Sequence, residues 1–230
     1  MKYYLLGYYL IQFKKLNVGS LIDREIYTCS TCLNTSLMCN FARSWTCSKE
    51  DMISACQSFT INSQTIKEIQ NWTDLKDIEG QTQYIEAFSS TETAREYKNI
   101  FFAHLNKIHL LGVYLPESES KKLIEDFNSD NPQCGEIGIR KIIKREETES
   151  ELGKIVGFDL IGVERSGNFH SFQCHDLEAE FKKKFKVEFN DFGLIKNEEH
   201  WEKLVEYAND EKNGCEPVPW YFAKLKKFEL

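Results

Sequence analysis

The sequence is poor in the residues that break regular structure, with only 4 prolines and 12 glycines among 230 residues. This scarcity argues against a loop-rich protein, and no segment recurs at the spacing of about 20–50 residues that marks solenoids and propellers. The sequence also has no apolar run near the roughly 20 residues that a membrane-spanning helix needs. These absences point away from repeat proteins and membrane proteins.

The short motifs that identify several enzyme classes are missing too. The sequence contains no G-x-x-x-x-G-K-[ST] loop, no G-x-G-x-x-G turn, no H-E-x-x-H helix and no G-x-S-x-G elbow. Carboxylates are abundant, but none is paired within an otherwise apolar segment, the usual setting of a catalytic acid with a raised pKa. We therefore expect no cofactor and no enzymatic activity.

Concentrated positive charge is also lacking, since the net charge is −7. The basic run Lys182-Lys183-Lys184 follows Glu178 and Glu180 on one predicted helix, which is typical of a solvated helix face. Nucleic-acid binders usually gather positive charge on one surface. We expect no nucleic-acid partner, and the acidic balance suits a basic protein partner instead.

The sequence is rich in core-forming residues, with 41% hydrophobic and 13% aromatic residues. That content is ample for a packed core, and the abundance of Phe and Tyr favours strands. Hydrophobic patterns predict strands at 3–13, 26–33, 83–88, 110–115, 137–145, 155–164, 169–174 and 218–228. Residues 3–13 are apolar on both sides, as in a central strand buried on both faces.

Capping residues and helical spacing predict helices between these strands, at 49–59, 63–72, 91–108, 117–127, 177–185 and 198–211. Ser48, Asn62 and Asp176 are the expected N-caps of three of them. Strands and helices alternate without a strict βαβ rhythm. The predicted fold class is therefore α+β, with a mixed, mainly antiparallel sheet and helices packed against it.

The segment 128–135 (NSDNPQCG) is the strongest cluster of structure-breaking residues. It predicts a boundary between an N-terminal α+β lobe, 1–128, which carries the cysteine-rich segment, and a C-terminal α+β lobe, 136–230. The two lobes form either separate units or one compact domain.

The first residues, MKYYLLGYYLIQFKK, resemble a secretory signal only superficially. The apolar run is rich in Tyr, lysines follow it, and no small-x-small cleavage site comes after it. We interpret residues 3–13 as a strand of the mature protein and expect the protein to be cytoplasmic.

Five of the 8 cysteines fall within residues 29–56. Without an export signal we expect reduced thiols, most of them structural, because free cysteine packs as a small hydrophobe. Cys29 and Cys32 have the C-x-x-C spacing of a zinc knuckle or a redox pair. No second knuckle follows, so a metal site formed by Cys29, Cys32 and His175 stays an alternative.

His170, Cys174 and His175 form the only tight group of reactive side chains in the sequence. On an extended strand, His170 and Cys174 lie about 13 Å apart on one face, whereas His175 points the opposite way. This geometry disfavours a catalytic pair or a shared metal, because a nucleophile and its base need hydrogen-bond contact.

The segment Trp220-Tyr221-Phe222, which follows Pro-Val-Pro, is the best candidate for an exposed aromatic patch. We take Trp220, Tyr221, His170 and Glu164 as candidate binding residues.

The last third of the chain resembles the small immunity proteins of bacterial polymorphic-toxin and contact-dependent inhibition systems. The resemblance is carried by GFDLIGVE, the turn after it, FHSFQCHDLEAEFKKKF and the closing PVPWYFAKLK. It implies a non-catalytic cytoplasmic binder that occludes a cognate toxin domain, often through an acidic surface. The cysteine-rich segment 29–56 is not a feature of such proteins.

Two other functions stay open at this point. One is a zinc- or thiol-dependent enzyme that uses the N-terminal cysteines, together with His175. The other is a structural subunit that assembles through the aromatic C-terminal segment, since the sequence does not fix an oligomeric state.

Overall fold

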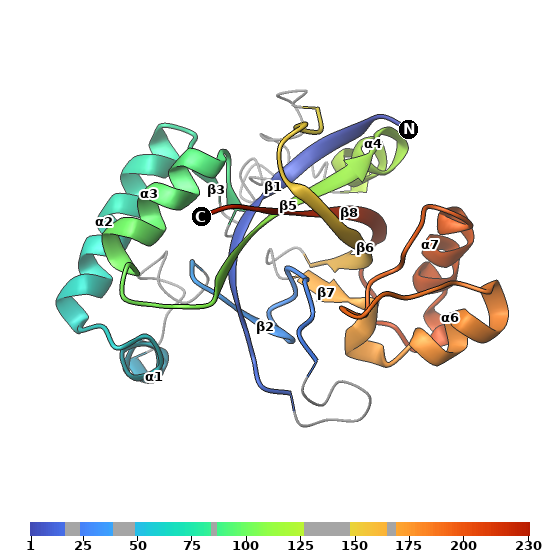
Figure 1. Cartoon of the computed structure of the whole chain (residues 1–230), viewed down its shortest axis with the longest axis horizontal. Helices are drawn as coiled ribbons and strands as arrows, with labels where there is room; N and C mark the ends of the chain where they lie inside the picture. Colours follow the sequence, from blue (N-terminus) through green and yellow to red (C-terminus); the bar gives the residue numbers. More distant parts are fainter. Residues whose placement is uncertain (17–23, 39–48, 84–86, 127–147, 165–168) are drawn as a thin grey trace.

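A computed structural model describes residues 1–16, 24–38, 49–83, 87–126, 148–164 and 169–230. The predicted N-cap Ser48, the boundary 128–135 and the strand 137–145 lie outside these residues. The described chain contains strands and helices in an α+β arrangement, as expected (Figure 1).

One eight-stranded sheet forms the centre of the protein, in the order β3-β4-β1-β5-β8-β6-β7, with β2 also pairing with β1. Every pairing between these strands is antiparallel, which confirms the expected type of sheet. The strands are β1 (Tyr3–Phe13), β2 (Asn34–Ser36), β3 (Thr82–Gln83), β4 (Ala87–Phe88), β5 (Ile108–Pro116), β6 (Lys154–Val163), β7 (Phe169–Ser171) and β8 (Trp220–Phe228).

The sheet is continuous across the predicted lobe boundary. β5 of the N-terminal half pairs directly with β8, and β8 pairs with β6. One hydrophobic core contains buried residues of both halves, including the wholly buried side chains of Trp220, Tyr221, Phe222, Tyr114, Tyr97 and Phe88. The described parts of the two halves therefore share one sheet and one core.

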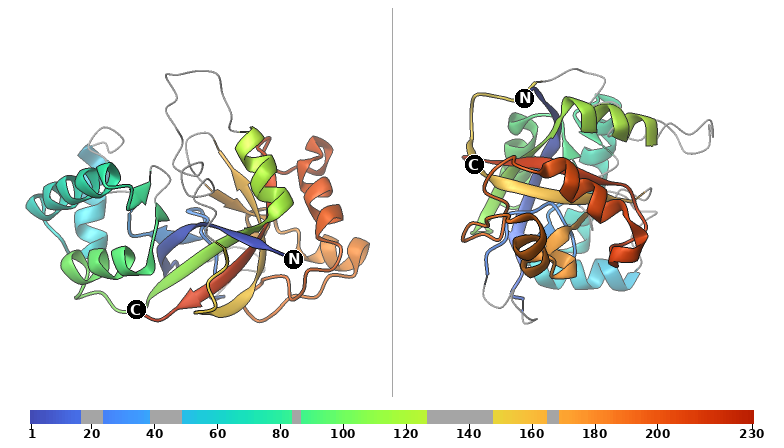
Figure 2. Two further views of the ribbon diagram at one scale, coloured as in Figure 1. Left: turned by 90° about the horizontal axis from the view of Figure 1, so that it is seen from above. Right: turned by 90° about the vertical axis from the view of Figure 1, so that its right-hand side faces the viewer.

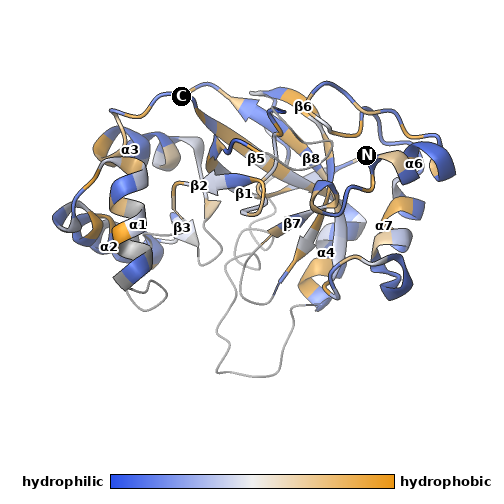
Figure 3. Ribbon diagram, turned by 90° about the horizontal axis from the view of Figure 1, so that it is seen from below, coloured by the Kyte–Doolittle hydropathy of each residue, from blue (hydrophilic) through white to orange (hydrophobic). Residues whose placement is uncertain are grey.

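The helices flank this sheet in separate groups (Figures 1 and 2). α2 (Ser63–Ile78) and α3 (Thr91–Phe101) lie at one end of the sheet with α1 (Lys49–Phe59), and α6 (Glu178–Phe185) and α7 (Trp201–Asn209) lie at the other. α4 (Glu117–Asp126) follows β5 directly and lies near α7. Hydrophobic residues run along the strands, whereas α6 is mostly hydrophilic (Figure 3).

Local signals explain several element boundaries. The Asn62 side chain accepts a hydrogen bond from the Thr65 N–H at 2.9 Å, and Ser90 does the same for Thr93 at 3.1 Å. Such N-caps satisfy amide groups that have no partner inside the helix. Asn62 is thus the cap of α2, as predicted, although the helix continues six residues beyond Trp72 to Ile78.

Two predicted elements differ from the structure because tertiary contacts override local pattern. α3 ends at Phe101 instead of continuing to Ile108, since Phe102 turns into the core and Ile108 already begins β5. Residues 26–33 form no strand. Their backbone carbonyls bond to a side chain instead, because the Asn34 amide donates to Ile26 and Thr28, both at 2.8 Å.

The predicted strand 169–174 ends at Ser171 and continues as the short 3₁₀ helix η3 (Phe172–His175). The Ser171 hydroxyl accepts the Gln173 N–H at 3.3 Å and so starts this turn. Asp176 has a left-handed backbone (φ 54°) and closes η3, so the prediction that it caps α6 was wrong. This turn decides where His175 points.

Candidate functional site

Four polar side chains meet where β6, β7 and the segment before β8 come together. Glu164 follows β6, His170 lies on β7, His175 ends η3, and Glu216 lies between the 3₁₀ helix η4 (Glu211–Asn213) and β8. We call these four residues the histidine cluster. Because η3 turns the chain after Ser171, His170 and His175 both reach Glu216, contrary to the opposite orientations expected on a strand.

The two imidazole rings are buried and the two carboxylates form the rim. The side chains of His170 and His175 are 11% and 14% exposed, and those of Glu164 and Glu216 are 33% and 37% exposed. His170 Nε2 lies 2.7 Å from Glu164 Oε1, and His170 Nδ1 lies 3.6 Å from Glu216 Oε1. His175 Nε2 is in direct contact with Glu216 Oε2.

Trp220 forms the floor of the histidine cluster. Its ring meets the His175 ring edge-on, with centroids 5.5 Å apart, and its indole N–H donates to the Glu216 carbonyl at 3.1 Å. Four residues singled out from the sequence, Glu164, His170, His175 and Trp220, are thus brought together here. Glu216 was missed, because nothing near it in the sequence links it to the histidines.

Glu216 pairs with both rings of the cluster. His175 Nε2 and Glu216 Oε2 contact each other directly, and Glu216 Oε1 lies 3.6 Å from His170 Nδ1. His170 Nδ1 is buried and has no hydrogen bond in the described part of the chain. The cluster is therefore a row of alternating carboxylates and imidazoles at the edge of the core.

The cysteine alternative does not assemble in the described residues. Cys29 is buried in the core and Cys32 is exposed, and no group of three His, Cys, Asp or Glu side chains in the described ranges could hold a metal ion. Cys39 and Cys47 lie outside those ranges. Cys174 contacts Ser30 Oγ at 3.3 Å, and burial raises the pKa of its thiol to about 11. A thiol with such a pKa is a poor nucleophile at neutral pH.

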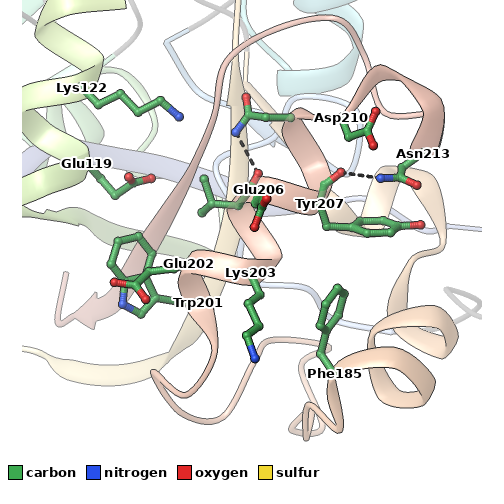
Figure 4. Close-up of a pocket in the computed structure, with 12 residues that line it drawn as sticks. Glu119, Lys122, Phe185, Trp201, Glu202, Lys203, Glu206, Tyr207, Asp210 and Asn213 are labelled. Carbon is green, nitrogen blue, oxygen red and sulfur yellow. Dashed lines mark hydrogen bonds between the residues drawn. The ribbon is translucent and has the colours of Figure 1, made fainter.

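A second feature is an open cleft of about 940 Å³ between α4 and α7. We call it the acidic cleft. Figure 4 shows Glu119 and Lys122 of α4 on one side of it, with Glu202 and Glu206 of α7 across from them. Its lining residues are Glu119, Lys122, Phe185, Trp201, Glu202, Lys203, Val205, Glu206, Tyr207, Asn209, Asp210 and Asn213.

Negative charge predominates in the acidic cleft, where carboxylates of four lining residues stand against two lysines. Glu119 is almost fully buried and accepts the Phe222 N–H at 3.2 Å. Burial raises the pKa of its carboxyl, and this hydrogen bond opposes the rise. Glu119 is thus fixed at the wall that α4 shares with β8, while Glu202 and Glu206 are exposed.

The expectation of an exposed aromatic patch was wrong. Trp220, Tyr221 and Phe222 have no exposed surface, because β8 is a central strand with β5 and β6 on either side. The Tyr221 hydroxyl donates to Asp126 Oδ2 at 2.6 Å beneath the Lys122 side chain, whose amine lies 5.6 Å from the Tyr221 ring centre. Tyr221 therefore supports the α4 wall and does not itself face a partner.

The acidic cleft was also missed in the sequence, because its walls come from segments about 80 residues apart. The only local signal was Glu202 and Glu206 at helical i,i+4 spacing on α7. Like charges at that spacing slightly destabilise a helix, so helix stability does not explain why both residues are glutamates.

Compared with protein-family models, curated protein sequences and solved structures, the chain matches none of them. No helix in the described ranges is both long and apolar enough to cross a membrane.

Proposed function

We propose that the protein is a non-catalytic, cytoplasmic binding protein of the immunity type, which holds a basic segment of a cognate toxin domain in the acidic cleft. The resemblance of the last third of the chain to immunity proteins motivates the choice of partner. The charge of the cleft is the observation that carries the proposal.

Charge complementarity supports a basic protein segment as the occupant. Glu202, Glu206 and Asp210 are exposed along one wall, within reach of arginine or lysine side chains entering the cleft. Complementary charges accelerate association and reject partners of the wrong sign. The net charge of −7 adds long-range attraction for a basic partner.

Hydrogen bonds and buried side chains hold the α7 wall in place. This favours binding, because few residues of the wall have to become ordered when a partner binds. The Asn209 side chain donates to the Trp220 carbonyl at 3.0 Å and accepts the Trp220 N–H at 3.0 Å. Leu204, Val205 and Ala208 are buried beneath α7. Such preorganisation reduces the entropy lost on binding.

The first test is native mass spectrometry of the untagged protein, purified gently from its own host. We expect a stoichiometric complex with a second protein, whose binding to purified chain is then measured by calorimetry at physiological salt. In the E202K/E206K variant we expect the affinity to fall by about one to two orders of magnitude.

A matched control is the E50K/D74K variant, which makes the same change in net charge on exposed positions of α1 and α2, at the other end of the sheet. This control should bind like the wild-type chain. Equal loss of affinity in both variants would show that the net charge, and not the acidic cleft, determines binding. Turnover of a substrate by the purified chain alone would also contradict the proposal.

A further inference from the structure

We infer that the acidic cleft selects an arginine side chain of its partner over a lysine, and that Glu119 is the residue that determines this choice. The inference rests on the proposed function, because it concerns the same cleft, and it adds which side chain the cleft holds. The bound guanidinium group contacts the Glu119 carboxylate and the ring of Trp201, and the exposed carboxylate of Glu202 adds negative charge beside them.

Glu119 reaches the cleft from the point where strand β5 gives way to helix α4. The pairing of β5 with β8 ends at Tyr114 and Lys224, and the chain then continues into α4. The Phe222 N–H, two residues before Lys224, is therefore bound by a side chain of α4, because Glu119 Oε2 accepts it at 3.2 Å. This hydrogen bond satisfies a buried amide and fixes the Glu119 side chain.

The second oxygen of the Glu119 carboxylate is available to a partner. The hydrogen bond to Phe222 occupies Oε2, and Oε1 has no hydrogen-bond or ion-pair partner in the described ranges. Glu119 is only 5% exposed and lines the cleft, and Figure 4 shows its carboxylate directed from α4 towards α7. Burial raises the pKa of this carboxyl, because it removes water from the charged form. A cation bound at Oε1 replaces that lost water.

Lys122 does not fully supply this cation, although it lies one turn after Glu119 on α4. Its amine is placed 5.6 Å from the centre of the Tyr221 ring. Its positive charge opposes the rise in the pKa of Glu119, but burial has the larger effect. Across the cleft, Glu202 and Glu206 add exposed negative charge on α7. A cation from a partner is therefore favoured at this end of the cleft.

Trp201 provides an aromatic surface close to Glu119. Its ring stacks on the Phe222 ring, with the two centroids 5.7 Å apart and the planes at 30°. Phe222 thus supports both groups, the Glu119 carboxylate through its N–H and the Trp201 ring through its own ring. Trp201 is half-buried and lines the same end of the cleft as Glu119 (Figure 4).

A fixed carboxylate beside an aromatic ring suits a guanidinium group better than an amine. A guanidinium group is planar, presents five N–H donors in a fixed fork, stacks on aromatic rings and is weakly hydrated. A lysine amine is a compact and strongly hydrated charge, so a half-buried site costs it more hydration. Among aromatic rings, that of Trp attracts cations most strongly. The arrangement therefore predicts selection of arginine.

Blocked peptides with one central residue test this selection, namely Gly-Gly-Arg-Gly-Gly and the same peptide with lysine or citrulline in the centre. Heteronuclear NMR of the isotope-labelled chain follows the indole N–H of Trp201, which is identified as the signal missing in W201F. We expect the arginine peptide to bind at least about tenfold more tightly than the lysine peptide. The citrulline peptide, which keeps the shape but lacks the charge, should not bind.

The variant E119Q identifies the residue responsible. Glutamine keeps an oxygen that can accept the Phe222 N–H, so the variant should fold, but it removes the charge. We expect E119Q to bind the arginine peptide at least about tenfold more weakly and to lose most of the preference over lysine. The control E125Q makes the same change at an exposed position of α4 outside the cleft and should bind like the wild-type chain.

Equal affinity for the arginine and lysine peptides, or equal affinity of E119Q and E125Q, would overturn the inference. An unchanged Trp201 signal at millimolar arginine peptide would do the same. The proposed function is tested separately, by measuring E202K/E206K with the protein partner. If the peptides are not distinguished but E202K/E206K still weakens that complex, the cleft binds a basic segment without selecting arginine. If the peptides are distinguished but E202K/E206K leaves the complex unaffected, the proposed function fails instead.

Discussion

Thr28 and Asp159 are 131 positions apart in the sequence, yet the Thr28 hydroxyl donates to Asp159 Oδ2 at 2.7 Å. Ser171 donates to the other oxygen, Oδ1, also at 2.7 Å. Asp159 has no exposed surface and lies on β6, opposite Ala223 of β8. The carboxyl therefore joins residues 24–33, β6 and β7 from inside the protein.

Burial raises the pKa of Asp159 to about 7, although the two hydroxyl donors oppose the rise. Between the unfolded value of about 3.9 and that folded value, the native state keeps a proton that the unfolded chain releases. Its contribution to stability is complete below pH 4 and is lost as the pH rises through 7. In this range, D159N should remove a slope of at most about 1.4 kcal/mol per pH unit from the free energy of unfolding.

Urea unfolding of wild-type chain and D159N at several pH values measures this slope, with D74N as control because Asp74 is exposed on α2. An Asn amide can accept one hydroxyl and donate to the other, so the variant should fold. If the difference between wild-type chain and D159N were flat from pH 4 to 7, Asp159 would not hold a proton in the native state.

Replacement of Trp220 should act on stability and not on a binding surface. Because the ring is wholly buried, W220A should lower the free energy of unfolding by about 3–5 kcal/mol through the cavity that it leaves. Thermal and denaturant unfolding check this value. The control I78A removes a side chain on a residue that is 85% exposed and should change stability by less than about 0.5 kcal/mol.

Lys224 forms a nearly buried ionic contact. Its amine lies 2.9 Å from Glu149 Oε2 and 3.6 Å from the centre of the Tyr3 ring. K224M keeps the length of the side chain but removes both interactions, and we expect a loss of about 1–3 kcal/mol. The loss is moderate because Glu149 is partly exposed and retains Lys226 at 3.4 Å.

A double-mutant cycle with E149Q tests this ionic contact, and K154M on the exposed end of β6 provides the control. A coupling energy near zero between Lys224 and Glu149 would contradict a stabilising ion pair between them and leave the Tyr3 ring and Glu198, at 3.7 Å, as the partners of the lysine.

Gly157 lies at an irregularity in the pairing of β6 with β8 and has φ +144°. A Cβ atom there would come within 2.6 Å of Leu194 Cβ, so G157A should destabilise the protein by more than backbone strain alone. Gly214 has φ +77° with nothing within 4 Å of an added Cβ. The loss of unfolding free energy in G214A therefore measures backbone strain without a clash, and we expect about 1–2 kcal/mol. Chemical denaturation should give a larger loss for G157A. Equal losses would contradict the predicted clash.

Much of the fold follows from the sequence, because strands buried on both faces leave long apolar runs. The segments that become β1, β5, β6 and β8 were all predicted to within about two residues. Residues 26–33 were misjudged, since their alternating pattern comes from a loop whose polar groups are satisfied by Asn34 and Asp159. No local pattern reports such distant partners.

The sites were less accessible to sequence reasoning. His170 and His175 were noticed as chemically capable residues, but the turn at Ser171 that directs both at Glu216 depends on two side-chain hydrogen bonds, from the Gln173 N–H to Ser171 Oγ and from the Ser171 N–H to Cys174 Sγ. The strand order is the second obstacle. In the sequence, Trp220 and Tyr221 follow two prolines, which suggested an exposed segment. In the structure they are buried because β8 lies between β5 and β6.

The central position of β8 also shapes the route by which the protein folds. β1 and β5 on one side, and β6 and β7 on the other, are each paired among themselves, and among the strands that the structure describes only β8 bridges the two pairs. During synthesis both halves must wait with open strand edges until residues 220–228 have left the ribosome. Such non-local pairing is slow and exposes aggregation-prone edges, so insertion of β8 should be the late, rate-limiting event of folding.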